Sequence, residues 1–306
     1  MELPEISSVT VDIIVDNFID VFEPSLPGVV ERAAPGRLKK PLLAAHGLSV
    51  LVTVQRNGVS RRILMDTSNS PLVFFNNLEA LEIPLESIDG LFLSHGHPDH
   101  YGGLQELLQR RQQPLDIYLH PASYLPKLLI TPKGRVGPWQ LEREALVQLK
   151  ARLHENTAPA LLEGMALITG PIEASVSYET PLPGPKRIVA GQEEKDTFED
   201  EQALVMRVKD RGLVVIAACS HPGITNIVKY AQKLTGETRV AAVIGGFHLT
   251  AGGPELIRNT IQGLRELNIG LILSGHCTGF RALTQLLAAF PQTFMVSCVG
   301  TRVSIG

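Results

Sequence analysis

The sequence has few cysteines, no long basic run and no long apolar run. Its 306 residues include three cysteines, Cys219, Cys277 and Cys298. An odd number at wide spacing does not suit a disulfide framework and fits reduced thiols, or a thiol that binds a metal. Basic residues adjoin one another only in pairs, and the formal net charge is −3. The chain therefore lacks the charge pattern of a protein that binds nucleic acid or an anionic membrane.

No apolar stretch reaches the roughly 18 residues that a membrane-spanning helix needs. The N-terminal stretch "MELPEISSVTVDIIVDNF" is acidic and alternates like a strand, which is unlike a signal peptide. We therefore expect a cytoplasmic protein with no membrane partner. A hydrophobic content of 44% and a charged content of 19% are those of a globular protein that can bury a large core.

Strand and helix patterns alternate in two stages along the chain. The first stage has strand patterns at 9–18, 48–55, 61–68, 90–95 and 115–121, and helix patterns at 71–88 and 102–113. The second has a hairpin at 201–219, strands at 240–249, 270–276 and 293–305, and helices at 223–236, 253–268 and 280–290. This repetition predicts an α/β fold over 1–306, a single domain of two βα halves with their sheets face to face and helices outside. Residues 121–200 contain many prolines, a helical pattern at 137–153 and an acidic stretch, and we expect them to form an inserted lid.

The stretch "IDGLFLSHGHPDHYGGLQELL" places four polar side chains with metal-binding chemistry at the end of an apolar strand. They are His95, His97, Asp99 and His100. A strand end, a tight loop and a helix start deliver them, so His95 and His97 can hold one divalent ion while Asp99 and His100 hold a second. Two ions at about 3.5–4 Å can share a hydroxide that attacks an ester. A loop of surface histidines is the alternative, and the density of the cluster argues against it.

Further ligands must come from the second half of the chain. His221, His248 and His276 each follow an apolar strand and would open onto the same rim. His248 is equally compatible with a ligand, a substrate contact or a core residue. Cys219 is either a thiolate ligand or a small buried residue. Cys277 and Cys298 are expected to pack, while His120 and His154 are expected to be structural or solvated.

The segment "SHGHPDHYGGL" resembles the His-x-His-x-Asp-His signature of the metallo-β-lactamase superfamily. The resemblance implies an αββα sandwich and a binuclear metal centre. It also implies that His276 joins Asp99 and His100, and that His221 completes the set of His95 and His97. Many members carry a bridging acid in a Gly-Asp pair where this chain has Ala218-Cys219, so Cys219 is a possible metal bridge.

Two further residues are expected near this centre. Asp66 in "LMDTS" is expected to brace a ligand histidine without touching the metal, although an Asp in a simple turn is the alternative. His46 in "HGLS" is either a substrate contact or a structural residue.

The likeness also extends over about residues 10 to 300 to one branch of the superfamily. The stretches "LLAAHGLSVLV", "VIGGFHL" and "GHCTG" resemble the branch of 7,8-dihydropterin-6-methyl-4-(β-D-ribofuranosyl)-aminobenzene-5′-phosphate synthase. That likeness implies a transferase that releases pyrophosphate.

The function expected from these residues is that of a metal-dependent hydrolase. A metal-bound hydroxide would attack a phosphate or carboxylic ester of a small molecule, with Asp99 as the catalytic residue that orients it and accepts its proton. The cofactors would be two divalent ions, zinc first, with iron or manganese compatible with the same ligands. The synthase reaction, a diiron oxygen reductase and a non-catalytic metal-binding protein remain as alternatives. A homo-oligomer also remains open.

Overall fold

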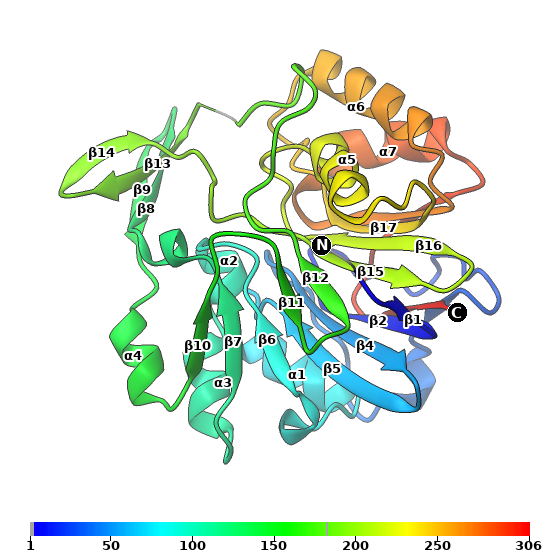
Figure 1. Cartoon of the computed structure of the whole chain (residues 1–306), viewed down its shortest axis with the longest axis horizontal. Helices are drawn as coiled ribbons and strands as arrows, with labels where there is room; N and C mark the ends of the chain where they lie inside the picture. The colour runs from blue at the N-terminus through cyan, green and yellow to red at the C-terminus, as the bar shows by residue number, and fades with distance from the viewer. Residues whose placement is uncertain (1–2, 182) are drawn as a thin grey trace.

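Two eight-stranded sheets lie face to face in the computed structural model, which describes residues 3–181 and 183–306 (Figure 1). The first sheet consists, in spatial order, of β10 (Arg152–Glu155), β7 (Asp116–Leu119), β6 (Gly90–Phe92), β5 (Val59–Met65), β4 (Ser49–Arg56), β2 (Ser8–Val15), β20 (Thr301–Ile305) and β3 (Val30–Arg32). The second consists of β11 (Ala160–Leu162), β12 (Ala166–Ile168), β15 (Leu204–Val208), β16 (Gly212–Ala217), β17 (Val240–Gly246), β18 (Leu271–Gly275) and β19 (Phe294–Val296), with β1 (Glu5–Ile6) beside β15.

Helices cover the outer faces of both sheets (Figure 1). Those associated with the first sheet are α1 (Pro71–Ala80), α2 (Pro98–Tyr101), α3 (Leu104–Arg110) and α4 (Arg143–Gln148). Those on the second sheet are α5 (Ile224–Thr235), α6 (Pro254–Glu266) and α7 (Phe280–Ala289). The described residues also form short 3-10 helices: η1 (Pro35–Arg37), η2 (Leu85–Ser87), η3 (Pro121–Tyr124) and η4 (His276–Thr278). The result is the αββα sandwich that the sequence predicts.

Strand alternation explains why both faces of each sheet are apolar. In β4, Val50 and Val52 point into the core between the sheets, whereas Leu51 packs on the helix side. In β17, Ile244 faces the same inter-sheet core and Val243 faces the helices of the second half. Successive side chains of a strand point to opposite faces, so a continuous apolar strand can fill two layers of the core at once.

The segment expected to form a lid is only partly separate from the sandwich. Four of its strands make a small third sheet, which projects to one side in Figure 1: β14 (Gln192–Lys195), β13 (Pro185–Val189), β8 (Lys127–Thr131) and β9 (Gly134–Trp139). However, β10 pairs with β7, and β12 pairs with β15. The segment between the third-sheet hairpins thus contributes strands to both main sheets. Leu182, which also falls in this segment, lies outside the described residues.

Two expected elements differ from those observed. The helical pattern at 137–153 yields only the short helix α4, because residues 137–139 belong to β9 and Lys150 has a left-handed φ of 64° that stops the helix. The strand expected at 293–305 is split into β19 and β20, since the chain turns at Gly300 (φ 80°) and crosses from the second sheet to the first.

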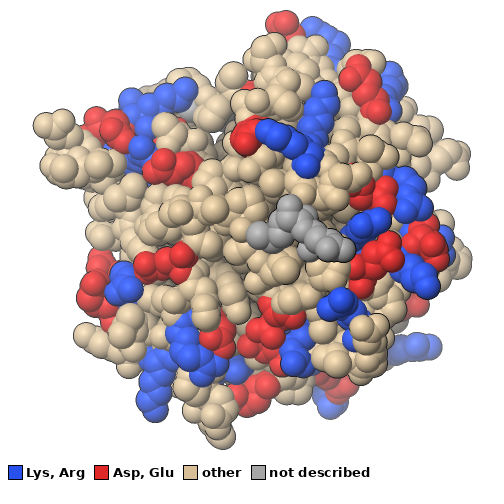
Figure 2. Space-filling view, viewed as in Figure 1, with Lys and Arg blue, Asp and Glu red and all other residues tan. Residues whose placement is uncertain are grey.

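The surface shows no separation of charge on the face in Figure 2, where basic and acidic residues are intermixed. Among the described residues, no helix combines the length and the apolar character needed to cross a membrane.

Candidate metal centre

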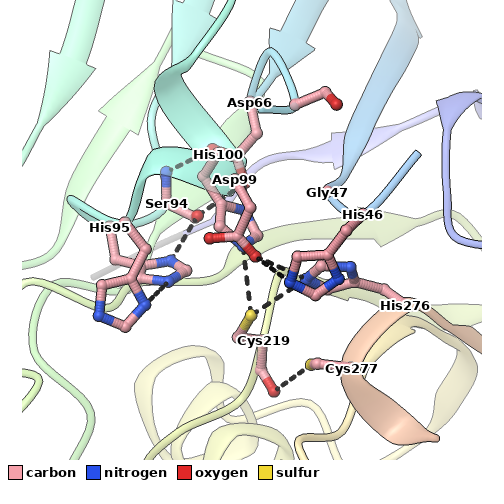
Figure 3. Close-up of polar contacts among 12 residues, drawn as sticks. His46, Gly47, Asp66, Ser94, His95, Asp99, His100, Cys219, His276 and Cys277 are labelled. Carbon is pink, nitrogen blue, oxygen red and sulfur yellow. Dashed lines mark hydrogen bonds and ion pairs between the residues drawn. The ribbon is translucent and has the colours of Figure 1, made fainter. Parts of the chain in front are cut away.

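The ligand candidates from the two halves meet where strands of both sheets end (Figure 3). His95 follows β6, His97 caps the start of α2, and Asp99 and His100 lie within α2. Cys219 and His221 follow β16, and His276 follows β18 directly. Parallel strands such as β16, β17 and β18 end at the same edge, so residues far apart in sequence converge there.

The first ligand group contains His95, His97 and His221, with one ligand atom of each within 4.8 Å of the others. Nε2 of His95 lies 3.1 Å from Nδ1 of His97, and the His221 ring centroid lies 5.0 Å from each of the other two. Burial, with a further contribution from neighbouring imidazoles, lowers the pKa of all three well below the ordinary histidine value. Neutral imidazoles are the form that binds a metal.

The second group contains Asp99, His100, Cys219 and His276, again with ligand atoms within 4.8 Å of one another. The Cys219 thiol sulfur lies 3.2 Å from Nε2 of His100 and 3.3 Å from Nε2 of His276. Asp99 Oδ2 lies 3.6 Å from Nε2 of both histidines. Burial opposes ionisation of Asp99, but His100 and its other hydrogen-bonding neighbours hold the pKa of Asp99 well below its usual value.

A third and smaller group consists of Cys219, His221 and His248. The half-buried His248 adopts a left-handed φ of 45°, and its ring centroid lies 4.3 Å from that of His221. His248 Nδ1 is buried and has no hydrogen-bond partner among the described residues. The structure thus brings His248 to the centre, beside the first group.

Four of these imidazoles are held in the same way, with Nδ1 bonded to an oxygen. The partners are Ser94 Oγ for His95 (2.9 Å), Asp66 Oδ2 for His100 (2.6 Å), Glu201 for His221 and Asn17 Oδ1 for His276 (3.2 Å). Such contacts fix the ring orientation and leave Nε2 free to bind an ion. The set of imidazole nitrogens, one thiol and one carboxylate suits zinc, and it is compatible with iron or manganese. The residues present therefore fit a metal centre.

Asp66 and Glu201 are the two carboxylates behind these imidazoles. Asp66, fully buried at φ 60°, also accepts from the backbone N–H and the hydroxyl of Ser94, at 2.8 and 2.7 Å. Glu201 also accepts from the backbone N–H groups of Ser220 and His221, and burial raises its pKa to about 7. Each carboxylate orders both an imidazole and the backbone beside it.

The loop between His95 and His97 is fixed by the segment that was expected to be a lid. Gly96 N–H donates to Asp200 Oδ2 at 2.8 Å, and Asp200 Oδ1 accepts from Lys127 Nζ at 2.8 Å. Lys127 is almost fully buried and also lies 3.2 Å from Asp196. A Cβ at Gly96 would come within 2.3 Å of the Ser123 backbone oxygen, so only glycine permits this close approach.

His46 lies at the solvent side of the centre. Its Nε2 is 3.3 Å from Asp99 Oδ2, and its ring stacks on His276 with centroids 5.3 Å apart. The imidazole is 62% exposed. The hydrogen bond with Asp99 raises the pKa of His46. His46 thus contacts Asp99 and His276 in the centre and is open to solvent.

Comparisons with known proteins show the superfamily of the chain. The sequence model of the Metallo-beta-lactamase superfamily matches residues 47–200. The chain is also 34% identical to the 7,8-dihydropterin-6-methyl-4-(beta-D-ribofuranosyl)-aminobenzene-5'-phosphate synthase of Methanocaldococcus jannaschii, over 83% of this chain and 88% of the relative. The chain belongs to the metallo-beta-lactamase superfamily.

Solved structures extend this likeness to the whole fold. The crystal structure of Tm1679, described as a metal-dependent hydrolase of the beta-lactamase superfamily, matches with a TM-score of 0.74 and 25% identity, over 97% of this chain and 98% of that one. A diphosphatase of the PhnP family matches with a TM-score of 0.51 and 12% identity, over 97% of each chain. The second likeness concerns the fold alone.

Several supporting residues of this metallo-beta-lactamase centre were not anticipated from the sequence. Asp200 ends the segment expected to form an inserted lid and Glu201 begins the expected hairpin, a few residues before the apolar strand β15. That junction of acids with a buried strand was the available signal. Asn17 and Lys127 stand in no recognisable motif. They are identified only by their contacts.

The remaining histidines and cysteines lie outside the three ligand groups formed by described residues. Cys277, which is expected to pack, is buried in η4, where its thiol donates to the Cys219 carbonyl oxygen at 3.4 Å. His120 accepts from the Ala122 N–H at the start of η3. His154 bonds Asp116 and stacks on Tyr118. Cys298 is buried.

Proposed function

We propose that the protein is a metal-dependent hydrolase that acts on a phosphate or carboxylic ester of a small molecule with the help of two divalent ions. The observation that carries the proposal is the pair of adjacent ligand groups, whose nearest rings, His95 and His100, have centroids 4.2 Å apart. Each group contains residues from both halves of the sandwich. The likeness to Tm1679, described as a metal-dependent hydrolase, supports the same activity.

The residues would divide the work as follows. His95, His97 and His221 would hold one ion, and Asp99, His100, Cys219 and His276 the other. Bound divalent ions lower the pKa of water and stabilise negative charge on an ester oxygen. The Asp99 carboxylate would orient the attacking water and accept its proton. His46 bonds Asp99 and is mostly exposed, so the proton can pass through its imidazole to solvent.

The decisive test combines elemental analysis with a panel of phosphodiesters, phosphomonoesters, lactones and thioesters. We expect about two zinc, iron or manganese ions per chain, turnover of at least one ester, and incorporation of ¹⁸O from labelled water into the product. His97→Ala should abolish turnover, whereas His154→Ala removes an imidazole outside the centre and should leave it unchanged. Full metal occupancy without turnover across the panel would contradict a hydrolase.

The sequence identity favours one second candidate. Because a relative with 34% identity is named a dihydropterin ribofuranosylaminobenzene phosphate synthase, the same centre can be tested as a transferase that releases pyrophosphate. In that reaction the ligand residues would hold the ions that neutralise the leaving group. Release of pyrophosphate that depends on an aromatic acceptor, without ¹⁸O in the product, would favour the transferase over the hydrolase.

A further inference from the structure

The ring of Phe198 lies against the first ligand group of the metal centre. It is nearly parallel to the His221 imidazole, with centroids 4.1 Å apart and an interplanar angle of 11°. It also meets the His97 imidazole edge to face, with centroids 5.8 Å apart. Phe198 is only 1% exposed. One buried apolar ring therefore contacts two of the three imidazoles of this group.

The backbone of Phe198 is held in an unusual conformation. Its φ of 54° lies in the left-handed region, which bulky residues rarely adopt and which stores conformational strain. The Phe198 N–H donates to Asp196 Oδ1 at 2.9 Å, and the Phe198 carbonyl oxygen accepts from the Glu201 N–H at 3.0 Å. Strain of this kind persists only where the surrounding contacts hold the residue. The turn from 196 to 201 thus fixes the ring against the imidazoles.

A buried ion network connects this turn to the third sheet. Lys127 Nζ on β8 donates to Asp196 Oδ2 at 3.2 Å and to Asp200 Oδ1 at 2.8 Å, so one cation binds an acid on each side of Phe198. All three charged side chains are at most 2% exposed. The Asp196 N–H donates to the Pro185 carbonyl oxygen of β13 at 3.2 Å. The position of the ring therefore depends on the third sheet, which projects to one side in Figure 1.

These contacts reach the first ligand group and not the second. Asp200 Oδ2 accepts from the N–H of Gly96, the residue between His95 and His97. Within the described ranges 3–181 and 183–306, neither Phe198 nor the two acids beside it contacts a residue of the second group through a ring or a side-chain hydrogen bond. A change at Phe198 should therefore affect the two ligand groups unequally.

We propose that Phe198 is a positioning residue of the metal centre, whose ring holds the His221 and His97 imidazoles in the orientation that binds the ion of the first ligand group. A ring stacked on an imidazole restricts rotation of that imidazole, because rotation would bring the two rings into collision. Contacts behind a ligand histidine set metal affinity in this way. The inference rests on the two-ion centre of the proposed function and not on the reaction that occurs there.

The test is titration of the full chain with cobalt after chelation, followed by absorption spectroscopy. Cobalt binds the same kinds of ligand as zinc, and its spectrum distinguishes the two ligand groups. The second group contains the Cys219 thiol, so an ion there gives a thiolate-to-cobalt charge-transfer band. An ion held by the imidazoles of the first group gives only the weaker visible bands. The wild type should bind about two ions.

Three variants of Phe198 separate the ring from the backbone. Phe198→Leu removes the ring and keeps an apolar side chain, so the cobalt affinity of the first group should fall by about tenfold or more, while the charge-transfer band of the second group is unchanged. Phe198→Gly also removes the ring and suits the left-handed φ, so it gives the same test if the leucine variant does not fold. Phe198→Tyr keeps the ring and should bind both ions as the wild type does.

Phe294→Leu is the matched control, because Phe294 is a buried phenylalanine in the helix-side core of the second half; its cobalt titration should equal that of the wild type. Unchanged affinity in every ring-deleting variant that folds would overturn the proposal, as would equal weakening at both ligand groups or the same weakening in Phe294→Leu. A wild type that binds no cobalt would refute the centre and the proposal together. A selective loss at the first group would support the proposal even if no ester is turned over.

Discussion

At the scale of single residues, the Cys219 thiol is the group whose removal we expect to change the metal content of the centre most. Its sulfur lies between Nε2 of His100 and Nε2 of His276, at a position where the superfamily resemblance suggested a bridging acid. We predict that Cys219→Ala lowers the metal content from near two ions to near one per chain, measured by elemental analysis. Cys298→Ala, which removes another buried cysteine, should keep both ions. Retention of two ions in Cys219→Ala would exclude the thiolate as a required ligand.

Glu201 provides a second test at this scale, because it holds His221 without being a ligand itself. Glu201→Gln keeps the size of the side chain but replaces one of its two accepting oxygens, which bond the Ser220 and His221 backbone N–H groups and His221 Nδ1, with an amide group that cannot accept. We predict that affinity for the ion at the first ligand group falls by about 10- to 100-fold, measured by competition with a chelator. Glu199→Gln changes an exposed neighbour and should leave the affinity unchanged. Equal affinities for the two variants would contradict a positioning role.

At the scale of elements, the third sheet is tied to the metal loop by one buried cation. Lys127 on β8 lies between Asp196 and Asp200, and all three side chains are at most 2% exposed. Lys127→Met would leave two buried carboxylates without their cation, and we predict a loss of about 3–5 kcal/mol in the free energy of unfolding, measured by urea denaturation. Lys186→Met, on the neighbouring strand β13, should cost less than about 1 kcal/mol. A small effect of Lys127→Met would mean that the network is dispensable for stability.

Ion pairs between β7 and β10 predict that the free energy of unfolding depends on pH. The Arg152 guanidinium, with His154, lowers the pKa of Asp116 to about 2. The Asp116 carboxylate therefore binds a proton less readily in the folded state than in the unfolded state. The stabilisation is fully present above the ordinary aspartate pKa near 4 and is lost as the pH falls toward 2. Because these groups are partly exposed, we expect it to amount to about 1 kcal/mol.

Asp116→Asn should reveal this contribution by urea unfolding at several pH values. The wild type should be the more stable protein at about pH 6, and the difference should shrink below about pH 3. Glu106→Gln, which removes an exposed ion pair on α3, is the control. A difference that is independent of pH would assign the effect to packing and not to the ionised carboxylate.

Sequence patterns predict the helices and strands of this fold better than they predict the tertiary contacts between them. The strands and helices of both halves are present, because period-2 and period-3.6 patterns report which faces are buried. The small third sheet was not predicted, since β14 is polar and exposed, β13 is mostly half-buried, and neither strand carries such a pattern. The split of β19 from β20 also escaped prediction, because a crossing between two sheets depends on tertiary packing.

The same contrast applies to the centre. His95, His97, Asp99 and His100 are adjacent in sequence, so their role as candidates is visible directly. Apart from Ser94, which adjoins His95, the residues that hold the imidazoles come from distant segments, such as Asn17, which lies 259 positions before His276. A single polar residue in a loop has many possible partners. Only the assembled fold selects one.

At the scale of the whole molecule, the centre joins the two halves of the sandwich. The first ligand group takes two residues from the first half and one from the second, and the second group takes two from each. Bound ions should therefore stabilise the fold. We predict that chelation lowers the thermal unfolding midpoint, and that added zinc restores it in proportion to the logarithm of free ion concentration, measured by calorimetry. In His97→Ala, the unfolding midpoint should change less on chelation and on addition of zinc. An unchanged unfolding midpoint after chelation would mean that bound ions do not stabilise the association of the two halves.

The position of β20 has a consequence for how the protein is made. Residues 301–305 are the last strand in sequence, yet they lie between β2 and β3, which both come from the first 32 residues. During translation β2 and β3 lack the strand between them until residues 33–300 have been synthesised. A nascent chain that stalls before residue 301 would expose two unpaired strand edges, which are a known route to aggregation. Completion of the first sheet therefore depends on a strand that is synthesised long after its two neighbours.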